Sequence, residues 1–494
     1  MSIQNQKRKD LNHAPRRWWG VALTITAIGL AACDLDVESP ATVDIESLDS
    51  ENSIEALWSG MLAQVSHLAT GKAGPGGFFT FGALRTDELV HSGLPEQFPH
   101  LRPISDGAPI DPDLEGIGQL WDQSMLTRYV VDFGVERAGE IYEKYKDDPL
   151  SKVRDRVTRD RMRAFAWGGI AYRILGDNLC EAVIDGGPRE PHTLFYERGL
   201  EILDEGIAFA EANDVIEVDQ LGVRSAYAAR AQIRMMMGDW DGAVADAAMV
   251  ETGFTGLRTG HTTVEPNRRQ YNWLRFLDHL ANPFADANGG AGRNMTLWGT
   301  PFLEWGYNVT ADTGNDIRVT YSTHKTNANP HREFGGDDRR PWFRQDKYLS
   351  NTGASVFRLA TGAEMRLIEA EARLLNGDWQ GAVDKINELR EWWNDIAGGR
   401  LERDGHPLPL VSANSEEEAW ELLMKERGIE LWLEGRRLPD MRRWSVTPGH
   451  VPFEVVREAV GEDPEDDLRR NVLDIAGDFC IPIGATERRL NPNL

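Results

Sequence analysis

Three regularly spaced glutamates are the residues whose positions best suit a catalytic role. Glu426, Glu430 and Glu434 are four residues apart, so a helix would carry them on one face. Two such carboxylates could act as general acid and base, or as nucleophile, in a glycosidase. The same spacing also suits ion pairs with arginines of the following turn, such as Arg442 and Arg443. We favour the ion pairs, which leaves this segment without a predicted catalytic residue.

No other motif of a known catalytic chemistry is present in the sequence. The eleven histidines include no HExxH pair, and there is no nucleophile elbow, P-loop or dinucleotide-binding fingerprint. The three cysteines form no CxxC pair, which excludes a thiolate zinc site. These absences do not exclude an enzyme, but they leave none supported, and we expect no metal and no cofactor.

Aromatic side chains beside polar ones are the best candidates for a binding surface. Flat rings pack on the apolar faces of sugar rings, while amide, carboxylate and guanidinium groups orient the hydroxyls, so such side chains must be partly exposed. The candidates are Trp298, Trp305, Tyr307, Asn308, Trp342, Arg344 and Tyr348 in one segment, and Phe78, Phe79 and Arg85 in another.

The first 32 residues have the pattern of an export signal. A basic stretch precedes an uncharged run over residues 18–32, which is too short to span a membrane comfortably. The run ends in Leu30-Ala31-Ala32-Cys33, which looks like a bacterial lipobox with Cys33 as the lipidated first residue. Several acyl chains on Cys33 would anchor the protein stably to a membrane. The alternative is an ordinary signal peptide with a chance cysteine.

Cys180 and Cys480 remain once Cys33 is assigned to the anchor. An even pair in an exported protein suggests a disulfide, which would join two distant parts of the chain. Two buried free thiols are the alternative, and the sequence leaves both open.

The charge of the chain limits its partners. The 494 residues include 54 basic and 79 acidic side chains, a formal net charge of −25. Removal of residues 1–32 leaves 49 basic and 78 acidic side chains, or −29. Nucleic-acid binding is improbable because it requires a basic surface. We expect membrane contact through the lipid anchor only.

An internal repeat indicates the architecture that must position these residues. Residues 231–244 align without gaps to residues 370–383, and each copy contains a Gly-Asp-Trp turn between alanine-rich helices. This is the pattern of a tetratricopeptide-like helix pair, in which the turn glycine adopts a positive φ. A looser copy would end at Gly176-Asp177.

The rest of the chain falls into helical and irregular parts. Apolar periodicity predicts helix pairs over about residues 50–250 and 360–445, including one helix over residues 416–437. Irregular insertions rich in glycine, proline or asparagine occupy about residues 71–110 and 253–359, with a short strand predicted over residues 317–321. Long irregular regions inside a helical domain are usually functional.

Several short segments occur in an order typical of one family. They are Cys33-Asp34-Leu35-Asp36, Thr86-Asp87-Glu88, Asp316-Ile317-Arg318, residues 366–372, residues 426–437 followed by Asp440 and Arg443-Trp444, and the terminal residues 481–483 and 491–494. In this order they span essentially all of residues 33–494, and the chain resembles the SusD/RagB family of outer-membrane nutrient-binding lipoproteins. One departure is that residues 176–180 read Gly-Asp-Asn-Leu-Cys where that family usually has Gly-Asp-Val-Pro.

The resemblance implies a mainly α fold: a superhelix of tetratricopeptide-like helix pairs with an irregular, partly β ligand-binding half. It implies a non-catalytic protein at the outer membrane, lipid-anchored and facing the cell exterior. Such a protein would capture a glycan or another oligomeric nutrient and deliver it to a SusC-like, TonB-dependent transporter. The alternative is a helical-repeat scaffold that binds peptide or protein partners; a periplasmic hydrolase is a third reading, resting only on abundant carboxylates.

Overall fold

The computed structural model describes residues 49–71, 77–92, 104–105, 109–256, 258–259, 284, 295–323, 343–348, 357–396, 406–445 and 479–494. By its contacts the chain divides into Met1–Leu48 and Asp49–Leu494, and all described residues belong to the second unit. The predicted export signal, Cys33 and Trp342 lie outside the described residues.

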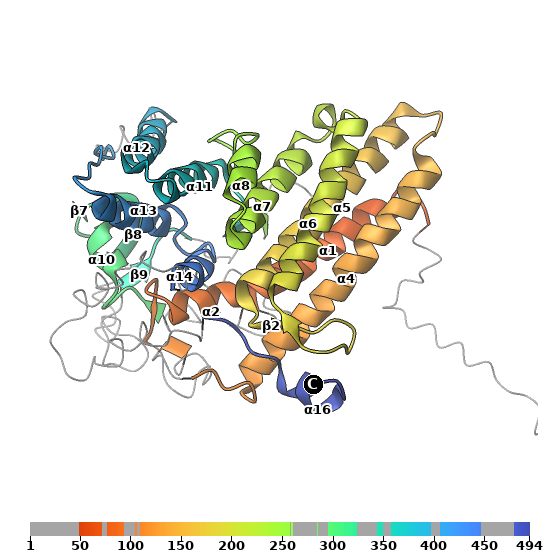
Figure 1. Ribbon diagram of the computed structural model, residues 1–494, viewed down its shortest axis with the longest axis horizontal. Coiled ribbons are helices and arrows are strands. Elements are labelled where there is room, and N and C mark those ends of the chain that lie inside the picture. The colour runs from red at the N-terminus through yellow and green to blue at the C-terminus, as the bar shows by residue number, and fades with distance from the viewer. Residues whose placement is uncertain are drawn as a thin grey trace, which may run out of the picture. The chain divides into compact units, whose positions relative to one another are not determined.

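Helices dominate the described part of the chain, which confirms the mainly α fold class. Those before residue 250 are α1 (Ser53–Thr70), α2 (Phe78–Arg85), α4 (Glu115–Tyr145), α5 (Ser151–Asn178), α6 (Thr193–Ala212), the short 3-10 helix η2 (Val215–Glu217), α7 (Gln220–Met237) and α8 (Trp240–Ala247). Those after residue 300 are α10 (Pro301–Trp305), α11 (Gly362–Leu375), α12 (Trp379–Ile396), α13 (Glu416–Glu430), α14 (Arg437–Ser445) and α16 (Ala485–Leu490). Neighbouring helices α1, α4, α5 and α6 pack side by side as long rods, and α11–α14 lie beyond α8 (Figure 1).

The two copies of the internal repeat form the helix pairs α7–α8 and α11–α12. Their turn glycines, Gly238 and Gly377, have φ values of 79° and 77°, which confirms the predicted positive φ. In each copy the following aspartate caps the second helix: Asp239 accepts from the Gly242 N–H at 3.1 Å, and Asp378 accepts from the Gly381 N–H at 3.0 Å.

The predicted end of α5 at Gly176-Asp177 is wrong, because the helix continues to Asn178. A Cβ on Gly176 would lie 2.5 Å from the Tyr196 ring of α6. This glycine therefore permits close helix packing and does not form a turn. Asp177 serves in a buried ionic cluster instead of a helix stop.

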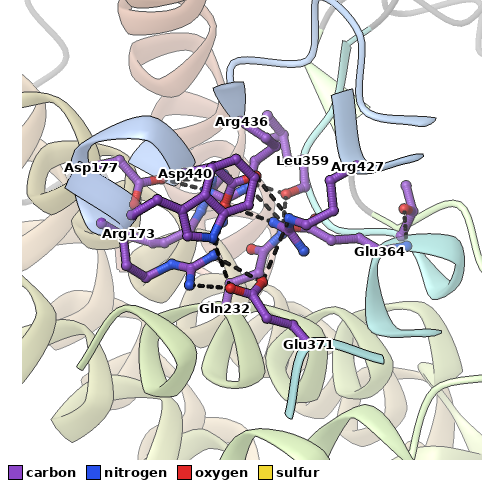
Figure 2. Close-up of polar contacts among 12 residues, drawn as sticks. Arg173, Asp177, Gln232, Leu359, Glu364, Glu371, Arg427, Arg436 and Asp440 are labelled. Atoms are coloured by element: carbon purple, nitrogen blue, oxygen red, sulfur yellow. Dashed lines mark hydrogen bonds and ion pairs between the residues drawn. The ribbon is translucent and has the colours of Figure 1, made fainter. Parts of the chain in front are cut away.

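That cluster joins α5, α7, α11, α13 and α14 in the interior (Figure 2). Arg436 donates to Asp177 at 2.6 Å and to Glu364 at 2.9 Å, and Arg173 also donates to Asp177 at 2.9 Å. Arg427 makes a two-pronged pair with Asp440, with both N–H···O distances 2.8 Å. Removing one member would leave a buried charge without its partner, so the cluster fixes which helices can meet.

The strands of the described residues are short. They are β1 (Val90–His91), β2 (Glu181–Ala182), β3 (Glu190–Pro191), β4 (Arg258–Thr259), β5 (Met295–Thr296), β6 (Gly306–Asn308), β7 (Thr313–Gly314), β8 (Asp316–Thr323), β9 (Phe343–Gln345) and β10 (Phe357–Arg358). The largest sheet has the order β7-β6-β8-β9, with β6 and β8 parallel and the other neighbours antiparallel. Strand β8 confirms the prediction over residues 317–321.

The helix predicted over residues 416–437 is wrong, because it breaks into α13 and α14. Between them Leu433 and Gly435 have φ values of 58° and 71°, which no helix continues. A Cβ on Gly435 would lie 2.3 Å from the ring of Phe79, so only glycine fits there. The break turns α14 back towards α2 and α5, with which it packs.

The carboxyl-terminal residues are fastened to the end of α5. Cys180 and Cys480 form a disulfide that joins two positions 300 residues apart in sequence. Beside it the Cys180 N–H donates to Ile481 O at 2.9 Å, and the Ile481 N–H donates to Asn178 O at 2.7 Å. The sequence left open a disulfide or two buried free thiols, and the structure contains the disulfide.

Candidate functional site

Two half-exposed aromatic residues, Trp298 and Phe343, lie next to each other at the edge of the four-stranded sheet. The Thr296 hydroxyl oxygen accepts both their backbone N–H groups, at 3.1 Å from Trp298 and 2.9 Å from Phe343. The Leu297 N–H donates to Phe343 O at 3.1 Å. Thr296 is itself buried and paired to Val90 of β1, so a rigid backbone presents the two rings.

Asn308 on β6 is partly exposed and extends this surface, and the ring of Tyr321 on β8, which is buried, supports Phe343. The rings of Tyr321 and Phe343 meet edge to face with centroids 6.1 Å apart, and Asn308 is the register partner of Tyr321. Burial raises the pKa of Tyr321, so its hydroxyl stays protonated. We call Trp298, Phe343, Tyr321 and Asn308 the aromatic face. Rings beside a hydroxyl and an amide are the groups that suit a sugar.

Arg344 lies on the opposite side of its strand from Phe343, because successive residues of a strand alternate. Its guanidinium donates to Asp346 at 2.8 Å, and Asp346 also accepts from Ser322 at 3.2 Å. The structure therefore separates Arg344 from the aromatic face and gives it an internal partner.

A buried ionic group fixes the sheet to α13. Arg318 of β8 donates to Asp316 at 2.7 Å and contacts Glu426 at 2.8 Å and Glu430 at 3.0 Å. Burial raises the pKa of Glu430, and Arg318 opposes this only in part. Burial alone would raise the pKa of Asp316, but Arg318 outweighs it and the pKa is lowered. The group positions the sheet and is closed to a substrate.

The expected partners of the three regularly spaced glutamates are therefore wrong. Glu426 also pairs with Arg390, at 2.6 Å, and Glu434 pairs with Lys347 at 2.9 Å. Arg443 instead binds Glu371, and Arg442 donates to main-chain oxygens at the end of α5, because the break after α13 directs α14 away from these glutamates. The glutamates do form ion pairs, but with Arg318, Arg390 and Lys347. Nothing in the described geometry supports acid–base catalysis by them.

A second group fixes the turn between α13 and α14. Glu88 accepts a 2.6 Å hydrogen bond from the Leu433 N–H, Tyr348 donates to Leu433 O at 3.3 Å, and Lys347 donates to Trp432 O at 2.5 Å. Burial raises the pKa of Glu88 to about 8 despite that hydrogen bond. Glu88 lies two residues before Val90 of β1, which pairs with Thr296, so the residue that holds this turn and the strand that supports Thr296 are neighbours in the chain.

The expectation of partial exposure is wrong for six of the candidate residues. The buried ones are Trp305, Tyr307, Tyr348, Phe78, Phe79 and Arg85. Phe78, Phe79 and Arg85 belong to α2, a helix that is buried on all sides inside a segment predicted to be irregular. Phe79 packs edge to face on Phe357 with centroids 4.8 Å apart. Every residue of α2 is buried, so this segment belongs to the core and offers no ring to a ligand.

The other three buried candidates have partners within the protein, two of them in the core. Trp305 packs against Phe302 at 5.0 Å, and Tyr348 stacks on Phe284 at 6.1 Å. Tyr307 donates to Asp312, which raises the pKa of Tyr307 to about 12. Only Trp298, Asn308 and Arg344 of the described candidates keep part of their surface in solvent.

Phe343, Tyr321 and Thr296 are members or supports of the aromatic face that sequence reasoning missed. Tyr321 lay within the predicted strand, where alternation could have indicated its side. Phe343 and Thr296 carry no such signal, because their role depends on a pairing between segments 47 residues apart.

Comparison with known proteins supports the same fold. Residues 275–493 match the family model described as the SusD family. The fold is similar to a SusD superfamily protein from Bacteroides vulgatus, with TM-score 0.60 and 16% identity over 90% of this chain and 98% of that one. It is also similar to a SusD superfamily protein from Bacteroides thetaiotaomicron, with TM-score 0.56 and 15% identity over 90% and 97%.

A third similar structure is a SusD-like carbohydrate binding protein from Bacteroides fragilis, with TM-score 0.52 and 15% identity over 90% of this chain and 99% of that one. No curated protein sequence matches the chain. Within the described residues, no helix is both long and apolar enough to cross a membrane. The same residues contain no cluster of three or more His, Cys, Asp or Glu side chains that could hold a metal ion.

Proposed function

Because the chain belongs to the SusD/RagB family, whose model matches residues 275–493, we propose that it is a nutrient-binding protein that captures a glycan or another oligomeric nutrient. The observation that carries this proposal is the aromatic face. Trp298 and Phe343 are partly exposed aromatic residues whose backbone N–H groups are held by Thr296, Asn308 is partly exposed on the same sheet, and the buried ring of Tyr321 packs on Phe343. The carbohydrate-binding title of the Bacteroides fragilis neighbour agrees with it.

The remaining parts of the proposal concern location and partners. Lipidation at Cys33 would hold the protein on the outer membrane, facing the cell exterior, and a SusC-like TonB-dependent transporter would receive the ligand. The protein would bind its ligand without degrading it. The lipobox at residues 30–33 and the resemblance to the family support these points.

The test is binding of a glycan to the aromatic face. A glycan array should identify a ligand, and calorimetry should then show that Trp298→Ala weakens its binding by about tenfold or more, as loss of one stacking ring implies. Tyr129→Ala is the matched control, because Tyr129 is a 63% exposed ring on α4, in another part of the fold. Equal affinity of both variants, or degradation of the ligand, would contradict the proposal.

The helical-repeat scaffold remains a second candidate, favoured by one observation. Leu126 and Tyr129 are exposed three residues apart on α4, with exposed fractions of 45% and 63%. Such a pair could contact a peptide or protein. Affinity purification with the wild type and with Leu126→Ser/Tyr129→Ser would test it; a partner lost only from the double variant would support this role.

A further inference from the structure

Glu88 is a buried carboxyl group without a cation of its own. Only 1% of its surface is exposed, and it forms no ion pair within the described residues. The neighbouring Asp87 is also buried, but Arg437 holds it with two hydrogen bonds of 2.8 and 2.6 Å. A carboxylate in the interior without a cation is costly, so Glu88 keeps its proton at neutral pH.

Two cations act on Glu88, and both are engaged by other carboxylates. Arg437 is held by Asp87, and Lys347 pairs with Glu434 at 2.9 Å. These cations lower the pKa of Glu88, but burial raises it by more, to about 8. The charged groups that act on Glu88 or on the adjoining Tyr348 are Asp87, Arg437, Lys347, Glu434 and Arg358.

One connection from Glu88 to the aromatic face passes through the turn between α13 and α14. Glu88 accepts from the Leu433 N–H at 2.6 Å, and the Tyr348 hydroxyl donates to Leu433 O at 3.3 Å. The Tyr348 N–H donates to the side chain of Gln345 at 2.9 Å. Gln345 ends strand β9, and Phe343 of the aromatic face begins it. A change at the turn therefore reaches Phe343 through a short series of hydrogen bonds.

A second connection follows the chain itself. Glu88 is two residues before Val90 of β1, which pairs with Thr296 of β5. The Thr296 hydroxyl oxygen holds the N–H groups of Trp298 and Phe343. Both connections therefore end on the backbone that presents these two aromatic residues.

Loss of the proton from Glu88 would place a negative charge among these contacts. That charge is stabilised if Lys347 leaves its present partner and turns to Glu88, or if water enters the interior. The residue before Lys347 is Asp346, whose N–H donates to Thr320 O at 2.7 Å and so continues the pairing of β8 with β9. A movement of Lys347 would therefore displace the strand that carries Phe343.

We propose that protonation of Glu88 controls ligand binding at the aromatic face: the face keeps its binding arrangement while Glu88 is protonated and loses it when the carboxyl group ionises. The inference rests on the proposed function and adds a proton-linked control of the same site. By linkage, protonation strengthens ligand binding and the bound ligand strengthens protonation. An alkaline medium would thus favour release of the ligand.

The test follows Trp298 in the absence of any ligand. Protein labelled with 5-fluorotryptophan is titrated from pH 6 to pH 10 by fluorine NMR, and the Trp298 resonance is identified by its loss in Trp298→Phe. This resonance should move with a midpoint near pH 8 in the wild type. It should stay in place in Glu88→Gln, which keeps an acceptor for the Leu433 N–H and cannot ionise.

Two further variants make the titration specific. Glu304→Gln changes an exposed carboxyl group of α10, a helix that contacts β8 of the same sheet, and should titrate like the wild type. Glu88→Asp keeps an ionisable group in a different position and should move the midpoint, which decides the question if Glu88→Gln does not fold. A Trp298 resonance that does not titrate, or an equal midpoint in Glu88→Asp, would overturn the inference. A midpoint near pH 6.5 that persists in Glu88→Gln would assign the change to His91 of β1 and also overturn it.

Calorimetry with a glycan selected on the array separates this inference from the proposed function. Between pH 6.5 and pH 9.5 its affinity for the wild type should fall about tenfold, and its affinity for Glu88→Gln by less than about twofold. A constant affinity for the wild type would overturn the inference and leave the proposed function in place. If no glycan binds at any pH, the proposed function fails, whether or not the Trp298 resonance titrates.

Discussion

Glu88 shows how burial gives a single carboxyl group an unusual property. It lies in the interior with the Leu433 N–H as its hydrogen-bond donor, and burial raises its pKa from 4.5 to about 8. Asp87 raises the pKa further, while Arg437 and Lys347 lower it. The folded state therefore holds this proton more tightly than the unfolded chain does.

Glu88→Gln should change how stability depends on pH. The glutamine amide keeps an acceptor for the Leu433 N–H and cannot ionise. In the wild type the stabilisation from the protonated acid is complete below about pH 4.5 and is lost as pH rises through about 8, a change on the order of 4 kcal/mol. Urea unfolding at pH 5 and pH 9 should show a flatter profile for the variant. Parallel profiles would mean that Glu88 does not carry this proton.

Thr296→Val should disturb the aromatic face without a change of shape at residue 296. Valine removes the oxygen that accepts from the Trp298 and Phe343 N–H groups. We expect a loss of about 1–3 kcal/mol in unfolding free energy and weaker ligand binding. Thr313→Val, at an exposed threonine of the same sheet, is the control and should alter neither. Unchanged tryptophan emission and ligand affinity in Thr296→Val would show that Thr296 does not position the rings.

Residue types alone could not show which candidate aromatics are exposed. Phe78, Phe79 and Tyr348 have the composition of a binding surface, yet all three are buried, and Phe79 and Tyr348 pack on Phe357. Their burial depends on the packing of α2 under the turn at Gly435, two segments far apart in sequence. Trp298 was predicted, and its neighbour Phe343 was not, because their proximity rests on one shared hydroxyl group.

Among the structural elements, the repeated helix pair was the most predictable. The Gly-Asp-Trp turn combines a left-handed glycine, a capping aspartate and the first residue of the next helix, all of which are local. The break between α13 and α14 could not be predicted in the same way. Leu433 adopts a positive φ because Glu88 and Tyr348, from other segments, hold its N–H and C=O groups.

Two glycine-to-alanine substitutions should have opposite effects on stability. Gly238 has a φ of 79° with open space around its Cβ position, so Gly238→Ala should cost about 1 kcal/mol from backbone strain alone. Gly60 lies inside α1 with equally open space and no positive φ, so Gly60→Ala should add about 0.5–1 kcal/mol. Thermal unfolding of both variants would measure this. A destabilised Gly60→Ala would contradict the assignment of α1.

For the molecule as a whole, the mainly α fold class could be predicted from the sequence, whereas the helix α2 lies inside a segment predicted to be irregular. The apolar periodicity and the internal repeat each extend over many residues, so a wrong assignment at one position does not change the predicted fold class. The buried ionic cluster of Arg173, Arg427 and Arg436 could not be predicted, since its members come from helices far apart in the chain. Such clusters specify which helices meet, and their residues look like ordinary surface charges in the sequence.

Loss of the disulfide should weaken the whole molecule. The bond closes a loop of 300 residues, and Cys180→Ser/Cys480→Ser would release that constraint on the unfolded chain. We expect a decrease of about 3–5 kcal/mol in unfolding free energy. Urea unfolding with and without a reducing agent is the measurement. The wild type should lose stability on reduction and the double variant should not. If reduction lowered the unfolding free energy of both proteins equally, the loss would not come from this disulfide.

The same junction has a consequence that can be monitored. Arg442 donates to Leu179 O at 2.9 Å, and Cys480 is bonded to the neighbouring Cys180, so the chain departs from the end of α5 near Ser445 and rejoins it near Phe479. Donor and acceptor dyes attached at Ser445 and Phe479 should therefore stay close while this junction is intact. Energy transfer between them would report whether the carboxyl-terminal residues remain bound to the end of α5.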